Sequence, residues 1–337
     1  MRYTRDAKQD IIIYILNKIA EGTTSISKVV SENLQISPNT VHNYLNALLE
    51  KGIIVKSKRG QYDLVTTHHT YHFTREDRAL VSDTEVYEKC LAPLLADAPE
   101  NVKHIWAYAL SEMVNNVIDH SGTQRMGIYI EHNYLNTRVA VVDSGVGIFG
   151  KIMDHFGLPD LETAICELFK GKLTTDAENH SGEGIFFSSK MMDTFLIISS
   201  GKVFATTKYN EEATFDDELG GEGTCVVMSL SNFSNRSAKE VFDQYSNDEG
   251  AFATTRIPIK NIFDSAPISR SQAKRICERL DKFEKVILDF DGVGWMGQGF
   301  AHQLFVVFQN AHPEVTLVPE NMGESVESMY RHVVTTV

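Results

Sequence analysis

The sequence predicts a multidomain α/β protein. Helical and strand-like periodicities alternate along most of the chain, a helix-rich and weakly basic segment comes first, and three short motifs follow one another between residues 110 and 230. At 337 residues the chain is long enough for two or three compact domains. We expect it to divide into residues 1–66, residues 67–232, a linker at 233–255, and residues 256–337.

Charge is distributed unevenly along the chain. The whole protein carries a formal net charge of −13, but residues 1–66 contain nine Lys or Arg against six Asp or Glu, an excess of +3. The remainder therefore carries −16. This asymmetry favours an anionic partner for the N-terminal segment alone.

Neither a membrane span nor a secretion signal is expected. No apolar run reaches the length of a bilayer, and the N-terminus leads into an amphipathic segment without a signal-peptide core. The cysteines lack the paired spacing of zinc or redox sites; they are Cys90, Cys166, Cys225 and Cys277. We therefore expect a cytoplasmic protein with buried, reduced thiols and no membrane partner.

The N-terminal segment has the pattern of three consecutive helices. Apolar residues recur at helical spacing over residues 8–20, and Thr24 and Ser25 are expected to cap a second, shorter helix that ends near Leu34. Ser37 as the N-cap and Pro38 in the first helical position then open a third helix. Its outward side is rich in amide side chains, which can form hydrogen bonds with the edges of DNA bases.

A hairpin with a basic tip follows at residues 53–65, and residues 5–66 as a whole resemble a winged helix-turn-helix. The resemblance implies that the third helix enters the major groove of DNA while the wing neutralises phosphates. The candidate DNA contacts are Asn39, Thr40, His42, Asn43, Lys56, Lys58 and Arg59. Because three cations at the wing give only modest affinity, binding as a homodimer is favoured. The alternative is a winged helix that contacts only proteins.

Two helices are expected within residues 74–95, and a long one from about residue 101 to residue 120. On the long helix, Glu112, Asn116 and His120 are spaced four apart, so each lies only about 40° from the last around the axis. A carboxylate, a carboxamide and an imidazole therefore share one stripe. Alternatively, this stripe is the ordinary polar side of an amphipathic helix.

A second motif begins at Asp143, which ends a predicted hairpin formed by residues 125–130 and 137–142. Gly145 and Gly147 follow, where the backbone must approach a ligand or adopt a positive φ. An aspartate at the end of a buried strand can accept a hydrogen bond from the exocyclic amine of adenine. Taken alone, Asp-x-Gly-x-Gly is also typical of an ordinary turn.

A third motif places Gly182 and Gly184 at the start of a helix, where backbone N–H groups can hold phosphates. The segment between the second and third motifs ends in a polar run at residues 174–179, which suits a mobile lid over a triphosphate. Thr224 then follows Gly223 at the start of an apolar strand.

In this order, Glu-x-x-x-Asn-x-x-x-His, Asp-x-Gly-x-Gly, Gly-x-Gly-Ile and Gly-Thr resemble the motifs of the GHKL ATPase family. That family includes gyrase B, histidine kinases and anti-sigma-factor serine kinases, and the last two branches are the most similar. The resemblance spans residues 75–232 and implies a GHKL α/β sandwich with a mixed sheet that binds ATP and Mg²⁺. No pair of histidine-bearing dimerisation helices precedes it, so phosphorylation of the chain's own histidine is not expected.

The resemblance also implies individual roles. Asn116 would hold Mg²⁺ on the phosphates, and Glu112 would be the catalytic general base. Asp143 would bind adenine with Gly145 and Gly147 beside it, and Thr224 would lie on the adenine side. Gly182 and Gly184 would lie at the phosphates, and His120 would bind the nucleotide or support the end of its helix.

The last part of the chain alternates helix and strand. Helices are expected over residues 269–280, 297–310 and 324–332, with strands over residues 285–290 and 315–318. Residues 256–337 resemble a STAS-like domain, related to modules that partner GHKL serine kinases. In those modules a loop serine takes a phosphate. Gly297, Gln298 and Gly299 occupy that loop here, so we expect a domain that docks on the ATPase and binds a protein partner without this switch.

A cluster of histidines near residue 70 is a candidate metal site. His68 and His72 would chelate a metal on a helix, but the flanking Thr, Tyr and Phe pattern favours a strand that links two domains. We therefore do not expect metal binding there.

These observations favour a cytoplasmic transcriptional or signalling regulator that couples ATP-Mg²⁺ binding to the binding of DNA, a protein partner, or both. One alternative is a protein serine/threonine kinase of the anti-sigma-factor type acting on a separate partner. The other is a nucleotide-binding adaptor without turnover.

Overall fold

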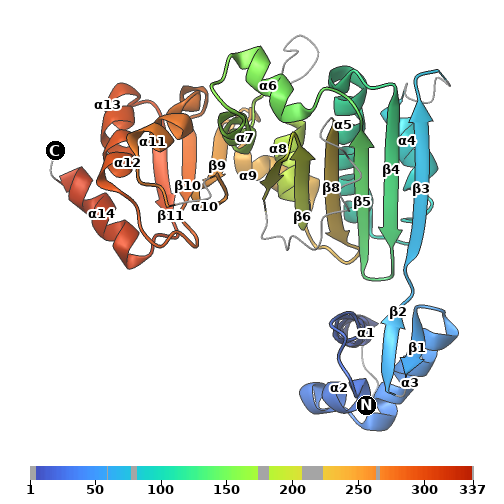
Figure 1. The fold of residues 1–337 in the computed structure, drawn as a ribbon. Coiled ribbons are helices and arrows are strands. Elements are labelled where there is room, and N and C mark those ends of the chain that lie inside the picture. Colours follow the sequence, from blue (N-terminus) through green and yellow to red (C-terminus); the bar gives the residue numbers. More distant parts are fainter. Residues whose placement is uncertain are drawn as a thin grey trace.

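A computed structural model describes residues 5–58, 60–76, 82–173, 182–206, 223–262 and 266–335. Figure 1 shows three bodies: a small N-terminal unit, a large central sheet with its helices, and a second α/β unit at the C-terminus. Within the described ranges, no helix is long and apolar enough to cross a membrane.

The N-terminal unit packs three helices against an antiparallel hairpin. Its elements are α1 (Arg5–Ala20), α2 (Ile26–Leu34), α3 (Pro38–Glu50), β1 (Ile54–Lys58) and β2 (Gln61–Leu64). Ser37 caps α3 as predicted, because its Oγ accepts a hydrogen bond from the N–H of Thr40 at 3.1 Å. Ser25 precedes α2 in a left-handed conformation and, contrary to expectation, forms no side-chain cap. Buried aliphatic side chains from all three helices form one small core.

The central sheet has the strand order β3-β4-β5-β8-β6-β7. Its strands are β3 (Thr67–Thr74), β4 (Arg125–His132), β5 (Asn136–Asp143), β6 (Thr194–Ser199), β7 (Lys202–Ala205) and β8 (Thr224–Ser231). Each of these pairings is antiparallel, whereas a mixed sheet was expected. Short hairpins join β4 to β5 and β6 to β7, and a hairpin connection permits only antiparallel pairing.

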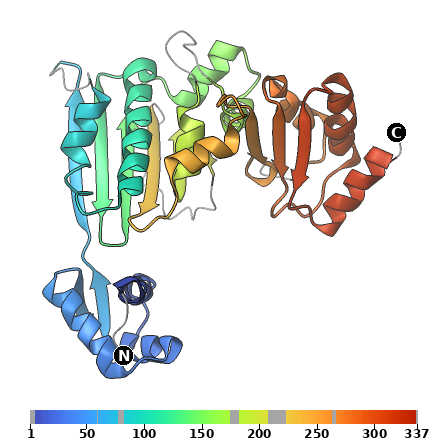
Figure 2. The same ribbon diagram turned by 180° about the vertical axis from the view of Figure 1, so that it is seen from behind.

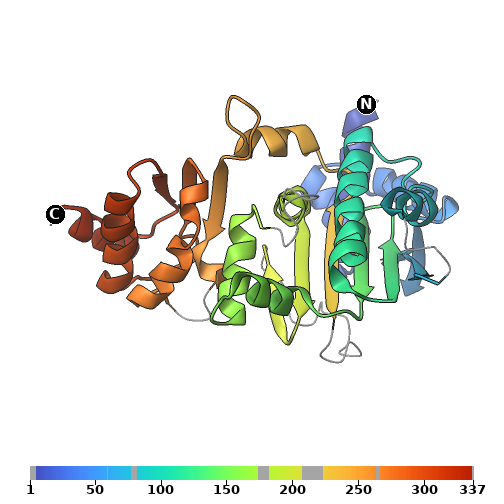
Figure 3. The same cartoon turned by 90° about the horizontal axis from the view of Figure 1, so that it is seen from above.

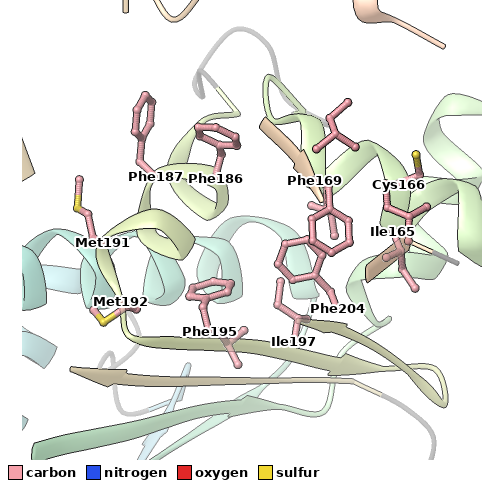
Figure 4. Close-up of a cluster of buried hydrophobic side chains, with 14 of the residues drawn as sticks. Ile165, Cys166, Phe169, Phe186, Phe187, Met191, Met192, Phe195, Ile197 and Phe204 are labelled. Carbon is pink, nitrogen blue, oxygen red and sulfur yellow. The ribbon is translucent and has the colours of Figure 1, made fainter. Parts of the chain in front are cut away.

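Helices cover one face of this sheet (Figures 2 and 3). They are α4 (Asp83–Cys90), α5 (Glu100–Asn116), α6 (Ile148–Phe156), α7 (Leu161–Lys170), α8 (Gly184–Met191) and α9 (Ala238–Tyr245). Figure 4 shows aromatic side chains of α7 and α8 above those of β6 and β7. Phe169 and Phe204 lie 4.3 Å apart between ring centroids, and both are buried. This apolar layer fixes the helices over the sheet.

Three segments differ from the sequence-based expectation. In the predicted helical region at residues 74–95, α4 is the only helix among the described residues 74–76 and 82–95, because β3 continues to Thr74 and turns follow Cys90. The predicted lid consists largely of α6 and α7, and its polar run at residues 174–179 lies outside the described residues. The predicted linker at residues 233–255 contains α9.

The start of α9 is well defined by its side chains. The Oγ of Ser237 accepts from the N–H of Glu240, and the Glu240 carboxylate accepts from the N–H of Ser237. Val241 and Tyr245 bury their side chains against the core. The Ser-x-x-Glu spacing was therefore a readable helix signal inside an otherwise polar stretch.

The two ends of the central sheet have different neighbours. At one end, the last residues of β5 and β6 flank the first residue of β8, so that Asp143, Thr224 and Ser199 lie side by side. At the other end, Tyr134 and Leu135 in the β4–β5 turn pack into the core of the N-terminal unit. The N-terminal unit therefore adjoins the end of the sheet opposite to Asp143 (Figure 1).

The C-terminal unit contains three parallel strands in the order β11-β10-β9. The strands are β9 (Thr254–Pro258), β10 (Lys285–Asp289) and β11 (Thr316–Glu320). The helices are α10 (Ile259–Ile262), α11 (Arg270–Cys277), the 3₁₀ turn η3 (Leu280–Lys282), α12 (Gln298–His302), the π-helical η4 (Gln303–Phe308), α13 (Gln309–Ala311) and α14 (Glu324–Thr335). The alternating pattern is as predicted, and β9 is an additional strand.

The four cysteines are free, as their spacing predicted. Cys90, Cys166 and Cys225 are buried, and Cys277 is half-buried. Burial raises the pKa of the Cys166 thiol to about 11, so that this thiol is protonated at neutral pH and is a poor nucleophile.

A buried ion pair joins α7 to the C-terminal unit. Glu167 and Lys170 are only 2% and 1% exposed, and the Lys170 ammonium donates to the Glu167 carboxylate. The same ammonium donates to the backbone oxygens of Arg275 at 3.0 Å and Glu278 at 2.6 Å. Arg279 contacts the other oxygen of Glu167 at 3.2 Å. Each charge therefore has partners on both sides of the interface, which offsets the cost of burying it.

Replacing Glu167 by leucine is expected to lower the free energy of unfolding by about 3–5 kcal/mol, because Lys170 would stay buried without its carboxylate. Glu162→Ala is the matched control on the same helix. Its pair with Lys202 is exposed, at 41% for each side chain, and such pairs contribute about 0–1 kcal/mol. Urea unfolding of both variants makes the comparison. Equal losses would contradict the structural role of the buried pair.

Candidate functional site

A cavity of about 250 Å³ opens beside the end of the central sheet that carries Asp143. Four separate parts of the chain line it: α5 with the turn after it, the ends of β5 and β8, α6 with α7, and the start of α8. Most of the residues predicted for the nucleotide site are among those that line it, namely Glu112, Asn116, His120, Asp143, Gly147, Gly182, Gly184 and Thr224. Residues that are far apart in sequence are thus brought to one place.

Asp143 lies at the floor of this cavity and is 5% exposed. Its Oδ1 accepts a hydrogen bond from the N–H of Gly145 at 2.8 Å. Burial raises the pKa of Asp143, while backbone hydrogen bonds from Gly145 and Thr224 oppose that rise. The result is a nearly buried carboxyl group at the cavity floor, suited to accept a hydrogen bond from a polar ligand group.

Gly145 does not line the cavity but packs behind the residues that do. A Cβ at this position would lie 2.1 Å from the backbone oxygen of Ser121. The neighbouring Val146 N–H donates to the same oxygen at 3.0 Å. Only glycine therefore lets the loop after β5 pack directly on the turn that ends the α5 helix.

Thr224 connects the floor to α6. Its Oγ1 accepts a hydrogen bond from the N–H of Ile148, the first residue of α6, at 3.1 Å. Gly147 has a φ of +77°, and Gly223 has a φ of +105°. A Cβ on Gly223 would also lie 2.1 Å from the backbone oxygen of Asp143, so no side chain fits there. The two glycines allow the chain to enter α6 and β8 at this crowded point.

The helical wall contains a change of helix type that the sequence did not predict. Glu112 and Asn116 lie on α5, but His120 lies in a π-helical turn, η1 (Val117–Ser121). The regular spacing expected along residues 112–120 therefore ends at Asn116, because i→i+5 bonding widens the turn. His120 still lines the cavity. Single π-helical turns are frequent at functional sites.

The start of α8 lies directly against Glu112. A Cβ on Gly184 would be 1.9 Å from Glu112 Oε2, so glycine permits this approach. Gly182 has a φ of +72°, and its backbone oxygen accepts from the N–H of Leu173 at 3.0 Å. The first-turn N–H groups of a helix have no partner within the helix and favour anions. A carboxylate and a helix N-terminus thus meet at one side of the cavity.

Lys151 is a cavity residue that the sequence-based prediction missed. It lies on α6, and its Nζ donates to the backbone oxygen of His120 at 2.7 Å. Its place one turn into the helix after Asp-x-Gly-x-Gly was the available signal. That signal was weak, because a lysine on a short surface helix is usually only a solvated charge.

The predicted DNA contacts lie on the N-terminal unit. Asn39, His42 and Asn43 are exposed on α3, and Lys56 and Lys58 are exposed on β1. His42 Nε2 lies 3.2 Å from Ser27 Oγ on α2. Thr40 is half-buried, and its hydroxyl is hydrogen-bonded to the Ser37 hydroxyl. Its side chain therefore belongs to the cap of α3. Arg59 lies outside the described residues.

Two family models match parts of the chain. Residues 5–90 match a winged helix-turn-helix, and residues 272–327 match a STAS-like domain of unknown function (DUF4325). The winged-helix and STAS-like resemblances are thus confirmed, and the winged helix-turn-helix indicates a DNA-binding regulator. Neither match includes the cavity, whose lining residues run from Glu112 to Val226, so the GHKL resemblance stays a prediction. No curated protein matches the chain.

Gly145→Ala is expected to disrupt the packing behind the cavity. The new Cβ would meet the Ser121 oxygen at 2.1 Å, so the loop and η1 must separate, and overpacking of this kind costs about 1–3 kcal/mol. Gly150→Ala is the control, since nothing lies within 4 Å of a Cβ there and alanine favours the helix. Urea unfolding would compare the two variants. A Gly145→Ala protein as stable as the Gly150→Ala protein would refute the packing role.

Proposed function

We propose that this protein is a DNA-binding regulator that binds ATP with Mg²⁺ in the cavity and converts nucleotide state into altered affinity for DNA. The observation that carries the proposal is the convergence of separate motifs on one cavity. A buried carboxyl group lies at the floor, and a helix N-terminus lies at one side. These features match the two ends of a nucleotide.

Each end of the nucleotide has a suitable partner. Asp143 would accept a hydrogen bond from the adenine amine, with Thr224 beside it. The N-terminus of α8 would bind phosphate oxygens through backbone N–H groups. Asn116 would contribute its side-chain oxygen to Mg²⁺, which neutralises phosphate charge and is usually bound through few protein ligands. Glu112 would orient an attacking water or hydroxyl.

A direct structural connection supports coupling to DNA. Only Val65 and Thr66 separate β2, in the wing, from β3, at the edge of the central sheet. Just beyond β3, Arg75 donates to the backbone oxygens of Ile118 and Thr123, on either side of the end of η1. A displacement of η1 by a nucleotide would therefore act on the strand that leads to the wing.

A second connection supports coupling to the C-terminal unit. Leu168 and Gly171 line the cavity, while Glu167 and Lys170 on the same segment are buried against that unit. Movement of α7 on nucleotide binding would change its contacts with Arg275 in the C-terminal unit. The affinity of the STAS-like domain for a protein partner would then change. Such coupling requires that the protein partner bind the nucleotide-bound and nucleotide-free arrangements with different affinities.

Calorimetric titration with ATP-Mg²⁺ tests the proposal. Asn116→Ala and Asp143→Asn should each weaken binding by about tenfold or more, because the first removes an oxygen ligand and the second replaces one carboxylate acceptor oxygen by an amide donor. Asn115→Ala is the matched control, since Asn115 neighbours Asn116 but is not a cavity residue. Absence of binding to the unmodified protein would overturn the proposal, and so would equal effects of the Asn115 and Asn116 variants.

A turnover assay then separates the remaining modes of action. Transfer of labelled phosphate from ATP to another protein would favour a serine/threonine kinase of the anti-sigma-factor type. Slow hydrolysis that Glu112→Ala abolishes would favour a nucleotide-gated switch. Binding without turnover would favour an adaptor.

A further inference from the structure

The outer edge of the central sheet is formed by β3, which pairs with β4 alone among the described strands (Figure 1). Arg75, which continues the register of β3, donates its N–H to the Gln124 oxygen at 3.2 Å. Bonded and non-bonded pairs alternate along an antiparallel ladder, so the backbone N–H and C=O groups of His68, Thr70 and His72 point away from β4. No backbone hydrogen bond from another described residue reaches these groups. A further strand can therefore pair with this edge.

The strand β3 lacks the features that usually prevent edge strands from pairing. Its eight residues include no lysine, no acidic residue and no proline, and its register with β4 runs without a bulge. The opposite edge of the same sheet is protected, because β7 has only four residues and begins with Lys202. In the C-terminal unit, the edge strand β11 contains Pro319. Of these three edges, only that of β3 is suited to a long antiparallel partner.

The pattern of β3 suits a second copy of this chain. With a twofold axis at Thr70, an antiparallel copy would place His68 opposite the partner's His72 and Thr70 opposite the partner's Thr70. Each outward-pointing N–H and C=O group would then meet a complementary group. Because β3 carries no lysine, arginine or acidic residue, this symmetric pairing brings no such charge against its like. On the helix-covered face, half-buried Tyr71 at the border of the core would gain a contact with the partner's His69.

We propose that the protein forms a homodimer through antiparallel pairing of two β3 strands, which joins the two central sheets into one. The interface is isologous, as a twofold dimer requires. The first residues of the two strands would lie about 20 Å apart along the shared edge, for six residues at about 3.4 Å each. Because the strands run in opposite directions, the two N-terminal units would lie at opposite ends of this edge and reach separate half-sites on DNA.

Sedimentation equilibrium of the full chain over a range of concentrations tests the pairing. The unmodified protein should be a dimer at the higher concentrations. Thr70→Lys should raise the dimer dissociation constant by about tenfold or more, because two ammonium groups would face each other at the twofold axis. Thr316→Lys is the matched control, since it makes the same change at an exposed position of β11 and should leave the constant unchanged. Thr70→Pro should give monomers, because it removes an N–H that β4 does not use.

Cross-linking then tests the register. With diamide as the oxidant of the two thiols, Thr70→Cys should form a disulfide-linked dimer. Directly opposed, hydrogen-bonded residues of an antiparallel pair have Cα atoms about 5.5 Å apart, which is within the range of a disulfide. Thr316→Cys should not cross-link, and neither should the unmodified protein, whose cysteines are buried or half-buried.

Two results would overturn the inference. One is an unmodified protein that stays monomeric at every concentration. The other is a dimer with the same dissociation constant in Thr70→Lys and Thr316→Lys, which would place the interface elsewhere. If circular dichroism shows that Thr70→Pro does not fold, the lysine and cysteine variants decide the matter. None of these measurements depends on ATP, so the inference and the proposed function fail separately.

Discussion

The candidate site depends above all on one close backbone contact, between the loop after β5 and the turn that ends the α5 helix. Gly145 leaves no room for a side chain against the Ser121 oxygen, and Val146 donates to that oxygen. This contact holds the helical wall, with Asn116 and His120, over the strand end that carries Asp143. A looser contact would separate the two halves of the cavity.

The position of that contact also determines what the cavity can influence. The N-terminal unit adjoins the far end of the same sheet, and β3 runs from it to Arg75, which holds the carbonyls around η1 (Figure 1). On another side, α7 forms part of the cavity wall and also the buried interface with the C-terminal unit, through Glu167 and Lys170. The C-terminal unit therefore contacts an element of the cavity wall directly, whereas the N-terminal unit is connected to the cavity through β3 and Arg75.

Local sequence signals predicted part of this architecture. The Ser37-Pro38 cap is set by neighbouring residues, and Asp-x-Gly-x-Gly and Gly-x-Gly are short patterns, so these signals were readable even though the contacts that require Gly145 and Gly184 are distant in sequence. The π-helical turn was not, because nothing within Val117–Ser121 interrupts the helical pattern. Lys151 and the Glu167–Lys170 pair depend on contacts with residues distant in sequence, which no local period encodes. The antiparallel sheet was missed because the resemblance, rather than the hairpins themselves, was used to set strand direction.

The most direct test of the account is the affinity of the full chain for a fluorescent DNA duplex, measured by anisotropy with and without ATP-Mg²⁺ at fixed salt. The account predicts a change of about fivefold or more in the dissociation constant, the usual lower range of coupling between two sites. The change should disappear in Asn116→Ala. Equal affinities with and without nucleotide, in a protein that binds both ligands, would contradict the central claim that the cavity controls DNA binding.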